Sequence, residues 1–169
     1  MKHGFTGTAD ILSASALPER SGADGTSAVP VKSCSLVISQ ALHRQLMAEA
    51  AAAYPNECCG LIEGARTGDA IEAVTLHPTR NLASTPDRFE IDPAEHFRLL
   101  RCLRGTGREI IGCYHSHPGG RAVPSPRDRE MASEENFVWL IAAVDEQALC
   151  EIAAYLFADG EFAPLREVS

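Results

Sequence analysis

Two histidines separated by one residue follow directly on a short apolar segment past the middle of the sequence. Residues 109–114, Glu-Ile-Ile-Gly-Cys-Tyr, predict a buried strand that runs into His115 and His117. Side chains alternate between the two faces of a strand, so both imidazoles point to one side and Ser116 points to the other. Asp128 follows eleven residues after His117. Two imidazoles and one carboxylate suit Zn²⁺ and leave a fourth position open for water, as in zinc hydrolases.

The spacing of these residues resembles a known signature. His-Ser-His-Pro at 115–118 is followed by six residues, then Ser125, two further residues and Asp128. An earlier segment, Glu-Cys-Cys-Gly-Leu-Ile, begins at Glu57. Together the two motifs resemble those of the JAMM (MPN-plus) zinc metallopeptidases, a family that includes deubiquitinating enzymes. The resemblance extends over roughly residues 35–167.

This resemblance implies a role for each motif residue. His115, His117 and Asp128 would bind one Zn²⁺ per chain, and zinc would lower the pKa of its bound water to around 7. Glu57 would be the general acid/base, and the Ser125 hydroxyl would stabilise the oxyanion. The family's fold is an α/β arrangement, a curved mixed β-sheet flanked by helices that resembles the fold of cytidine deaminases.

Several of these residues also have ordinary structural interpretations. Ser125, which precedes a proline, is a good helix N-cap, and a carboxylate at Asp128 is favourable in a first helical turn with or without a metal. Glu57 could be a solvated residue after a turn. Cys58 and Cys59 point to opposite faces of a strand, so at most one could reach a metal, and cysteine zinc sites usually show spaced pairs.

The rest of the chain predicts one domain preceded by a tail. Residues 1–32 are rich in Gly, Ser, Ala and Thr without sustained periodicity, so their composition predicts a disordered N-terminal segment. Residues 33–169 would form the JAMM/MPN metallopeptidase domain, in which strands and helices mix. Periodicity and capping signals place strands at 35–38, 58–63, 71–77, 109–114, 137–144, 149–157 and 161–165, and helices at 39–53, from 92 to 105 and from 125 onward.

Composition excludes several classes of function. The formal net charge of −8 argues against a general nucleic-acid-binding surface, which requires clustered Lys and Arg. No apolar run reaches the ~20 residues that span a bilayer, and the N-terminus lacks the apolar core of a secretory signal. The six cysteines lie mostly within apolar runs, so we expect no disulfide framework and a cytoplasmic location.

The resemblance favours hydrolysis of an amide bond. The chain has short loops and is similar to the compact prokaryotic members, some of which trim the tails of ubiquitin-like sulfur-carrier proteins, so we expect such a tail as substrate. The loop at 80–88 and the turn at Gly119-Gly120 are the expected walls of its groove. A cell-wall peptide endopeptidase is an alternative, and a non-catalytic MPN scaffold would lack the ligands present here. A zinc deaminase would require His-x-Glu and Pro-Cys-x-x-Cys motifs, which are absent.

Overall fold

A computed structural model describes residues 34–168 of the chain, so the predicted tail at 1–32 lies outside the described residues. Every strand and helix predicted within this range is found, and β2, β3 and β4 are longer than their sequence patterns. The elements are β1 (Ser35–Val37), α1 (Gln40–Ala53), β2 (Cys59–Thr67), β3 (Ala70–Thr79), α2 (Pro93–Leu103), β4 (Glu109–Pro118), α3 (Pro126–Met131), β5 (Phe137–Val144), β6 (Cys150–Ala158), β7 (Glu161–Pro164) and β8 (Arg166–Val168).

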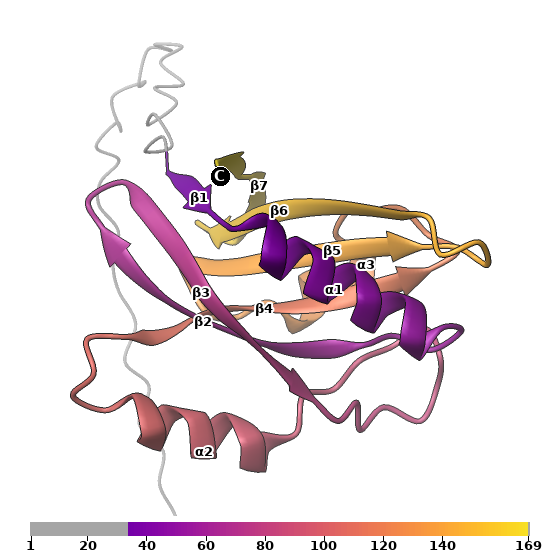
Figure 1. Ribbon diagram of the computed structural model, residues 1–169, viewed down its shortest axis with the longest axis horizontal. Helices are drawn as coiled ribbons and strands as arrows, with labels where there is room; N and C mark the ends of the chain where they lie inside the picture. The colour runs from indigo at the N-terminus through magenta and orange to yellow at the C-terminus, as the bar shows by residue number, and fades with distance from the viewer. Residues whose placement is uncertain (1–33, 169) are drawn as a thin grey trace, which may run out of the picture.

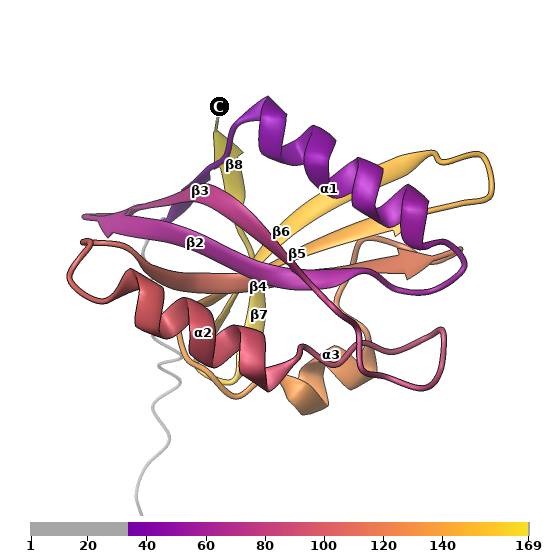
Figure 2. The same ribbon diagram turned by 60° about the horizontal axis from the view of Figure 1, so that its bottom comes forward.

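The strands form one mixed sheet in the order β7-β6-β5-β4-β2-β3-β1-β8. Strand β4 lies in the middle, antiparallel to β2 and parallel to β5. Figure 1 shows the twist of the sheet, and Figure 2 shows α1 on one face with α2 and α3 on the other. This arrangement confirms the α/β class and the curved mixed sheet flanked by helices.

The helix ends follow the capping residues of the sequence. Ser39 caps α1 by accepting a hydrogen bond from the backbone N–H of Leu42, and Asp92 caps α2 ahead of a proline in the first turn. Gly105 follows the end of α2 with φ +76°, a conformation that glycine adopts without strain. These signals are local, which is why the sequence alone located both helices.

Strand β8 is the element that the sequence analysis missed. It has three residues, Arg166–Val168, and runs parallel to β1 at the edge of the sheet. A three-residue segment with two charged side chains carries no readable alternation. Its pairing depends on β1, which lies more than a hundred residues earlier in the chain.

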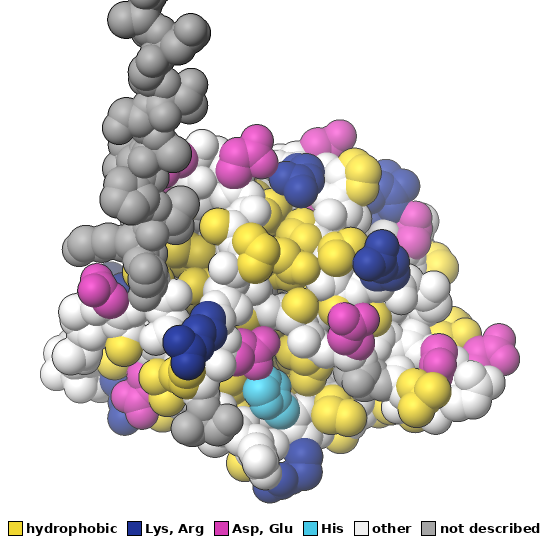
Figure 3. Space-filling view, turned by 90° about the horizontal axis from the view of Figure 1, so that it is seen from above, with side chains coloured by type: hydrophobic (Ala, Val, Ile, Leu, Met, Phe, Trp, Pro, Cys, Tyr) yellow, Lys and Arg dark blue, Asp and Glu magenta, His cyan; other side chains and the backbone are white. Residues whose placement is uncertain are grey.

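Surface charge is mixed on the face shown in Figure 3. Apolar side chains gather at its centre, and acidic and basic side chains alternate around them without a continuous basic stripe. Among the described residues, no helix is long and apolar enough to cross a membrane.

The main core lies between α1 and the sheet and contains one buried polar contact. Leu46 and Ala50 of α1 are fully buried against the sheet, and so is Tyr114 of β4. The Tyr114 hydroxyl donates a hydrogen bond of 2.5 Å to Oε2 of Glu49 on α1. This contact fixes α1 above the strand that continues into His115.

We expect Tyr114→Phe to lower the free energy of unfolding by about 1.5–3 kcal/mol, because hydrogen bonds to charged groups contribute in that range. Glu49→Gln keeps an acceptor and should cost less. Urea denaturation of both variants measures the difference. Equal stability of Tyr114→Phe and the parent protein would show that this contact does not hold α1.

Candidate metal centre

The three predicted metal ligands come together at one end of β4. The strand continues to Pro118, so His115 and His117 lie within the sheet, and His115 is paired with Cys59 of β2. Asp128 lies in the first turn of α3. One ligand atom from each of the three residues lies within 4.8 Å of the others, and residues 34–168 contain no second such group of three or more.

Their contacts are made by the atoms that a metal ion would use. The Nε2 atoms of His115 and His117 are 2.9 Å apart. Nε2 of His115 is 3.2 Å from Oδ1 of Asp128, and Nε2 of His117 is 3.4 Å from Oδ2. Both imidazoles and both carboxylate oxygens therefore face one point.

Both imidazoles present Nε2 to this point, although their pKa values shift in opposite directions: burial would lower the pKa of His117, but its hydrogen bonds to Asp128 and Arg121 raise it. Nδ1 of His117 donates to the carbonyl oxygen of Arg121 at 2.8 Å, so in the neutral ring Nε2 carries the lone pair. Burial lowers the pKa of His115, which keeps that ring neutral as a ligand must be. Its Nδ1 is buried without a hydrogen-bond partner, and its ring stacks on Phe89 at 4.3 Å. The residues present fit a divalent metal ion.

Ser125 and Asp128 form a reciprocal cap at the start of α3. The Ser125 hydroxyl oxygen accepts from the Asp128 N–H at 3.1 Å, and Oδ2 of Asp128 accepts from the Ser125 N–H at 2.6 Å. Burial would raise the pKa of Asp128, but His115 and His117 outweigh it and hold that pKa well below the usual range. The cap does not use the hydroxyl proton of Ser125, which can donate elsewhere.

Glu57 is buried, with 7% of its surface exposed, and it is not the solvated residue that local sequence also allowed. It lies two residues before β2. Burial raises the pKa of its carboxyl to about 7, with His117 opposing and Asp128 adding to the shift. A carboxyl with this pKa can both accept and donate a proton near neutral pH.

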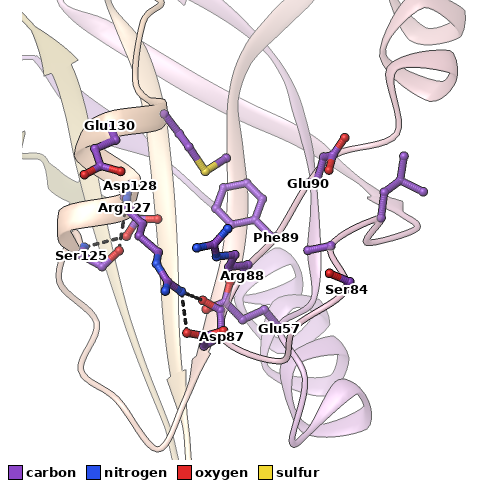
Figure 4. A pocket seen from close by; sticks show the side chains of 13 residues that line it. Glu57, Ser84, Asp87, Arg88, Phe89, Glu90, Ser125, Arg127, Asp128 and Glu130 are labelled. Carbon is purple, nitrogen blue, oxygen red and sulfur yellow. Dashed lines mark hydrogen bonds and ion pairs between the residues drawn. The ribbon is translucent and has the colours of Figure 1, made fainter.

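Glu57, Ser125 and Asp128 line one hollow of about 390 Å³ between the loop at 82–90 and α3, shown in Figure 4. A second hollow of about 510 Å³ shares Glu57, Ser125, Asp87 and Arg127 with the first. We call the two hollows together the site groove. Nη1 of Arg127 donates to Oδ2 of Asp87 at 2.5 Å, so an ion pair joins α3 to the loop where the hollows meet.

The expected groove walls are therefore half correct. The loop at 80–88 does supply one wall, but Gly119 and Gly120 line a separate hollow together with Val144 and Leu149. Helix α3 forms the second wall instead. The sequence did not indicate this, because Asp87 and Arg127 are forty residues apart and neither is a residue that the motifs specify.

Ser116, between the two histidines, has a role that the sequence analysis did not assign. Its hydroxyl oxygen accepts from the Cys58 N–H at 2.8 Å, and its own N–H donates to the Cys58 carbonyl at 3.1 Å. Alternation along the strand predicted that Ser116 points away from the two histidines. On that opposite face, its two hydrogen bonds hold the backbone of Cys58, the residue after Glu57. Neither neighbouring cysteine joins the ligand group, and Sγ of Cys59 lies 3.4 Å from the Thr79 hydroxyl.

Comparison with known proteins agrees with this geometry. Residues 39–155 match the family described as prokaryotic homologs of the JAB domain. The chain belongs to this family. The predicted JAMM/MPN membership is thus confirmed, and the family is metal-dependent. A solution structure of a protein from Desulfitobacterium hafniense, 28% identical, has a TM-score of 0.70 over 79% of this chain and 91% of its own.

Two curated relatives carry names of enzymes. The desampylase of Haloferax volcanii is 39% identical over 92 residues, which are 54% of this chain and 65% of the relative, just under two thirds of its length. The CysO-cysteine peptidase of Mycobacterium tuberculosis is 26% identical over 125 residues, which are 74% of this chain and 84% of the relative.

We expect the purified protein to bind one divalent metal ion per chain. His115→Ala, His117→Ala and Asp128→Ala should each lose most of it, because two remaining ligands rarely hold a catalytic metal. His77→Ala is the matched control, since His77 also contacts a carboxylate, Oε2 of Glu63, at 2.8 Å. Elemental analysis measures the metal. A variant that keeps a full equivalent would remove its residue from the ligand set.

Proposed function

We propose that the protein is a zinc metallopeptidase that hydrolyses an amide bond following a glycine in the C-terminal tail of a ubiquitin-like or sulfur-carrier protein. One observation carries the proposal: the buried carboxyl of Glu57 and the hydroxyl of Ser125 line the same hollow as Asp128 of the metal-binding group. A non-catalytic scaffold has no need of a buried carboxyl at Glu57 beside the metal-binding group.

His115, His117 and Asp128 are the residues that would hold the metal. Two imidazole nitrogens and one carboxylate oxygen are a common ligand set of catalytic zinc. When bound, Zn²⁺ supplies Lewis-acid chemistry, which makes water acidic enough to ionise near neutral pH and polarises a carbonyl group.

The chain's own side chains perform the proton transfers. Glu57 accepts the proton of the attacking water, because burial has raised its pKa to about 7. The Ser125 hydroxyl keeps its proton and donates a hydrogen bond to the oxygen of the amide carbonyl as negative charge develops there. Glu57 then returns its proton to the leaving amine, so one carboxyl acts first as base and then as acid.

The site groove supports a protein tail as substrate. Glu57 and Ser125 line both hollows, so chain segments on both sides of a scissile bond have room. The ion pair between Asp87 and Arg127 narrows the groove where the hollows meet, which favours a slender tail with glycines. The names of the two relatives, a desampylase and a CysO-cysteine peptidase, support the same substrate class.

Glu57→Gln should keep the metal and the fold but lower kcat by ~10²-fold or more, because the amide cannot accept a proton from water. Glu130→Gln is the matched control, since Glu130 lines the same hollow and this substitution also replaces a carboxylate with an amide. Turnover and metal content are measured together. A Glu57→Gln protein without metal would make Glu57 a ligand and contradict the proposed mechanism.

Ser125→Ala should lower kcat by roughly 10²-fold, because one donor to the oxyanion is lost. The change also removes the cap of α3, worth about 1 kcal/mol. Ser39→Ala, which removes the cap of α1, is the control for lost capping and should keep full activity. Loss of turnover in both variants would reduce the role of Ser125 to capping.

The substrate proposal is tested by incubating the protein with two candidates in parallel. The first is a ubiquitin-like carrier that ends in Gly-Gly followed by extra residues, and the second is a set of cell-wall muropeptides. We expect mass spectrometry to show cleavage of the carrier after its second glycine, abolished in Glu57→Gln. Cleavage of muropeptides alone would make the protein a cell-wall endopeptidase instead.

A further inference from the structure

The backbone of Glu57 is held by a loop and not by the sheet. The residue precedes Cys59, where β2 begins. Its N–H donates to the carbonyl oxygen of Pro86 at 3.3 Å, and its carbonyl oxygen accepts from Nδ2 of Asn81 at 3.0 Å. Both partners belong to the loop between β3 and α2, so this loop determines where the Glu57 backbone lies.

Asn81 uses its whole hydrogen-bonding capacity in this loop. Its Nδ2 donates to the carbonyls of Glu57 at 3.0 Å and Arg88 at 2.8 Å. Its Oδ1 accepts from the N–H groups of Ala83 at 2.9 Å and Glu90 at 3.0 Å. An amide side chain offers two donors and two acceptor lone pairs, and all four are satisfied. Carbonyls only accept and N–H groups only donate, so the partners fix the orientation of the amide.

The loop also reaches the metal-binding group. Asn81 and Ile91 form an isolated antiparallel bridge that closes the base of the loop. Within it, Phe89 stacks on the ring of His115 at 4.3 Å. The Asn81 amide thus joins the segment that carries Glu57 to the segment that covers a metal ligand.

We propose that Asn81 is a positioning residue for the hydrolysis: its Nδ2 group holds the Glu57 backbone so that the carboxyl stays aligned with the groove. The inference rests on the proposed function. Misplacement of a reacting group by about 1 Å can cost ~10²-fold in rate, so one lost tether has a measurable effect.

Asn81→Asp separates the two halves of this network, the bonds that Nδ2 donates and the bonds that Oδ1 accepts. The carboxylate has the same shape and still accepts from the N–H groups of Ala83 and Glu90, but it cannot donate to the carbonyls of Glu57 and Arg88. Asn81→Ala removes both halves. Asn56→Asp is the matched control, because it places the same charge next to Glu57 on an exposed side chain.

Amide hydrogen exchange of the metal-bound protein tests the tether without any substrate. In Asn81→Asp we expect faster exchange at the Glu57 amide, which bonds to Pro86, while the Ala83 and Glu90 amides stay protected. In Asn81→Ala all three should exchange faster. Asn56→Asp should match the parent protein, and all variants should keep one metal ion per chain.

Turnover tests the consequence. Asn81→Asp should lower kcat by ~10- to 10²-fold with KM changed less than about threefold, because the groove wall keeps the bonds from the Ala83 and Glu90 N–H groups while Glu57 shifts. Asn56→Asp should keep kcat within about twofold. Unchanged exchange at Glu57, an unchanged kcat, or an equal loss in Asn56→Asp would each overturn the proposal. If the parent protein cleaves neither candidate substrate, the proposed function fails, and the exchange rates alone decide whether Asn81 tethers Glu57.

Discussion

The position of β4 in the middle of the sheet is the constraint on which the site depends. The strand is bonded to β2 on one side and to β5 on the other, so its backbone has no freedom to move separately. Alternation then places His115 and His117 on one face and Ser116 on the other. Metal ligands on a rigid central strand keep their geometry better than ligands on a loop. The serine between them fixes Cys58 at the same time, so one tripeptide orients both motifs.

The remaining site residues come from two less regular segments. Asp128 is held by its cap with Ser125, and the same carboxylate oxygen that completes the cap faces His117. Helix capping and metal binding therefore require the same orientation of Asp128. The backbone of Glu57 is held by the loop between β3 and α2, in which the side-chain amide of Asn81 donates to the Glu57 carbonyl. The site thus combines residues on regular structure, which would hold the metal, with a loop-held Glu57, which would act as acid and base.

Much of the fold and of the ligand set could be predicted because the signals are local. Ser39 and Asp92 begin helices where the sequence placed them, since a cap depends on atoms within three residues. The strand that carries His115 and His117 could be predicted from the mostly apolar residues 109–114. The alternation of side chains along a strand then placed both histidines on one face. The family resemblance supplied Glu57, whose burial no local pattern could show. The short edge strand β8 was missed because its partners, β1 and His43 of α1, lie more than a hundred residues earlier in the chain.

The sequence by itself therefore determined every described element except β8, the shared face of the two histidines and the family. Tertiary structure decided how the segments between the elements meet. It brought the Asn81 amide to the Glu57 carbonyl and joined Arg127 to Asp87 across the groove. It also surrounded the Glu57 carboxyl with enough protein to raise its pKa to about 7. These contacts link residues that are distant in sequence, and burial and hydrogen bonding between them depend on the packing of the whole chain and not on any local pattern.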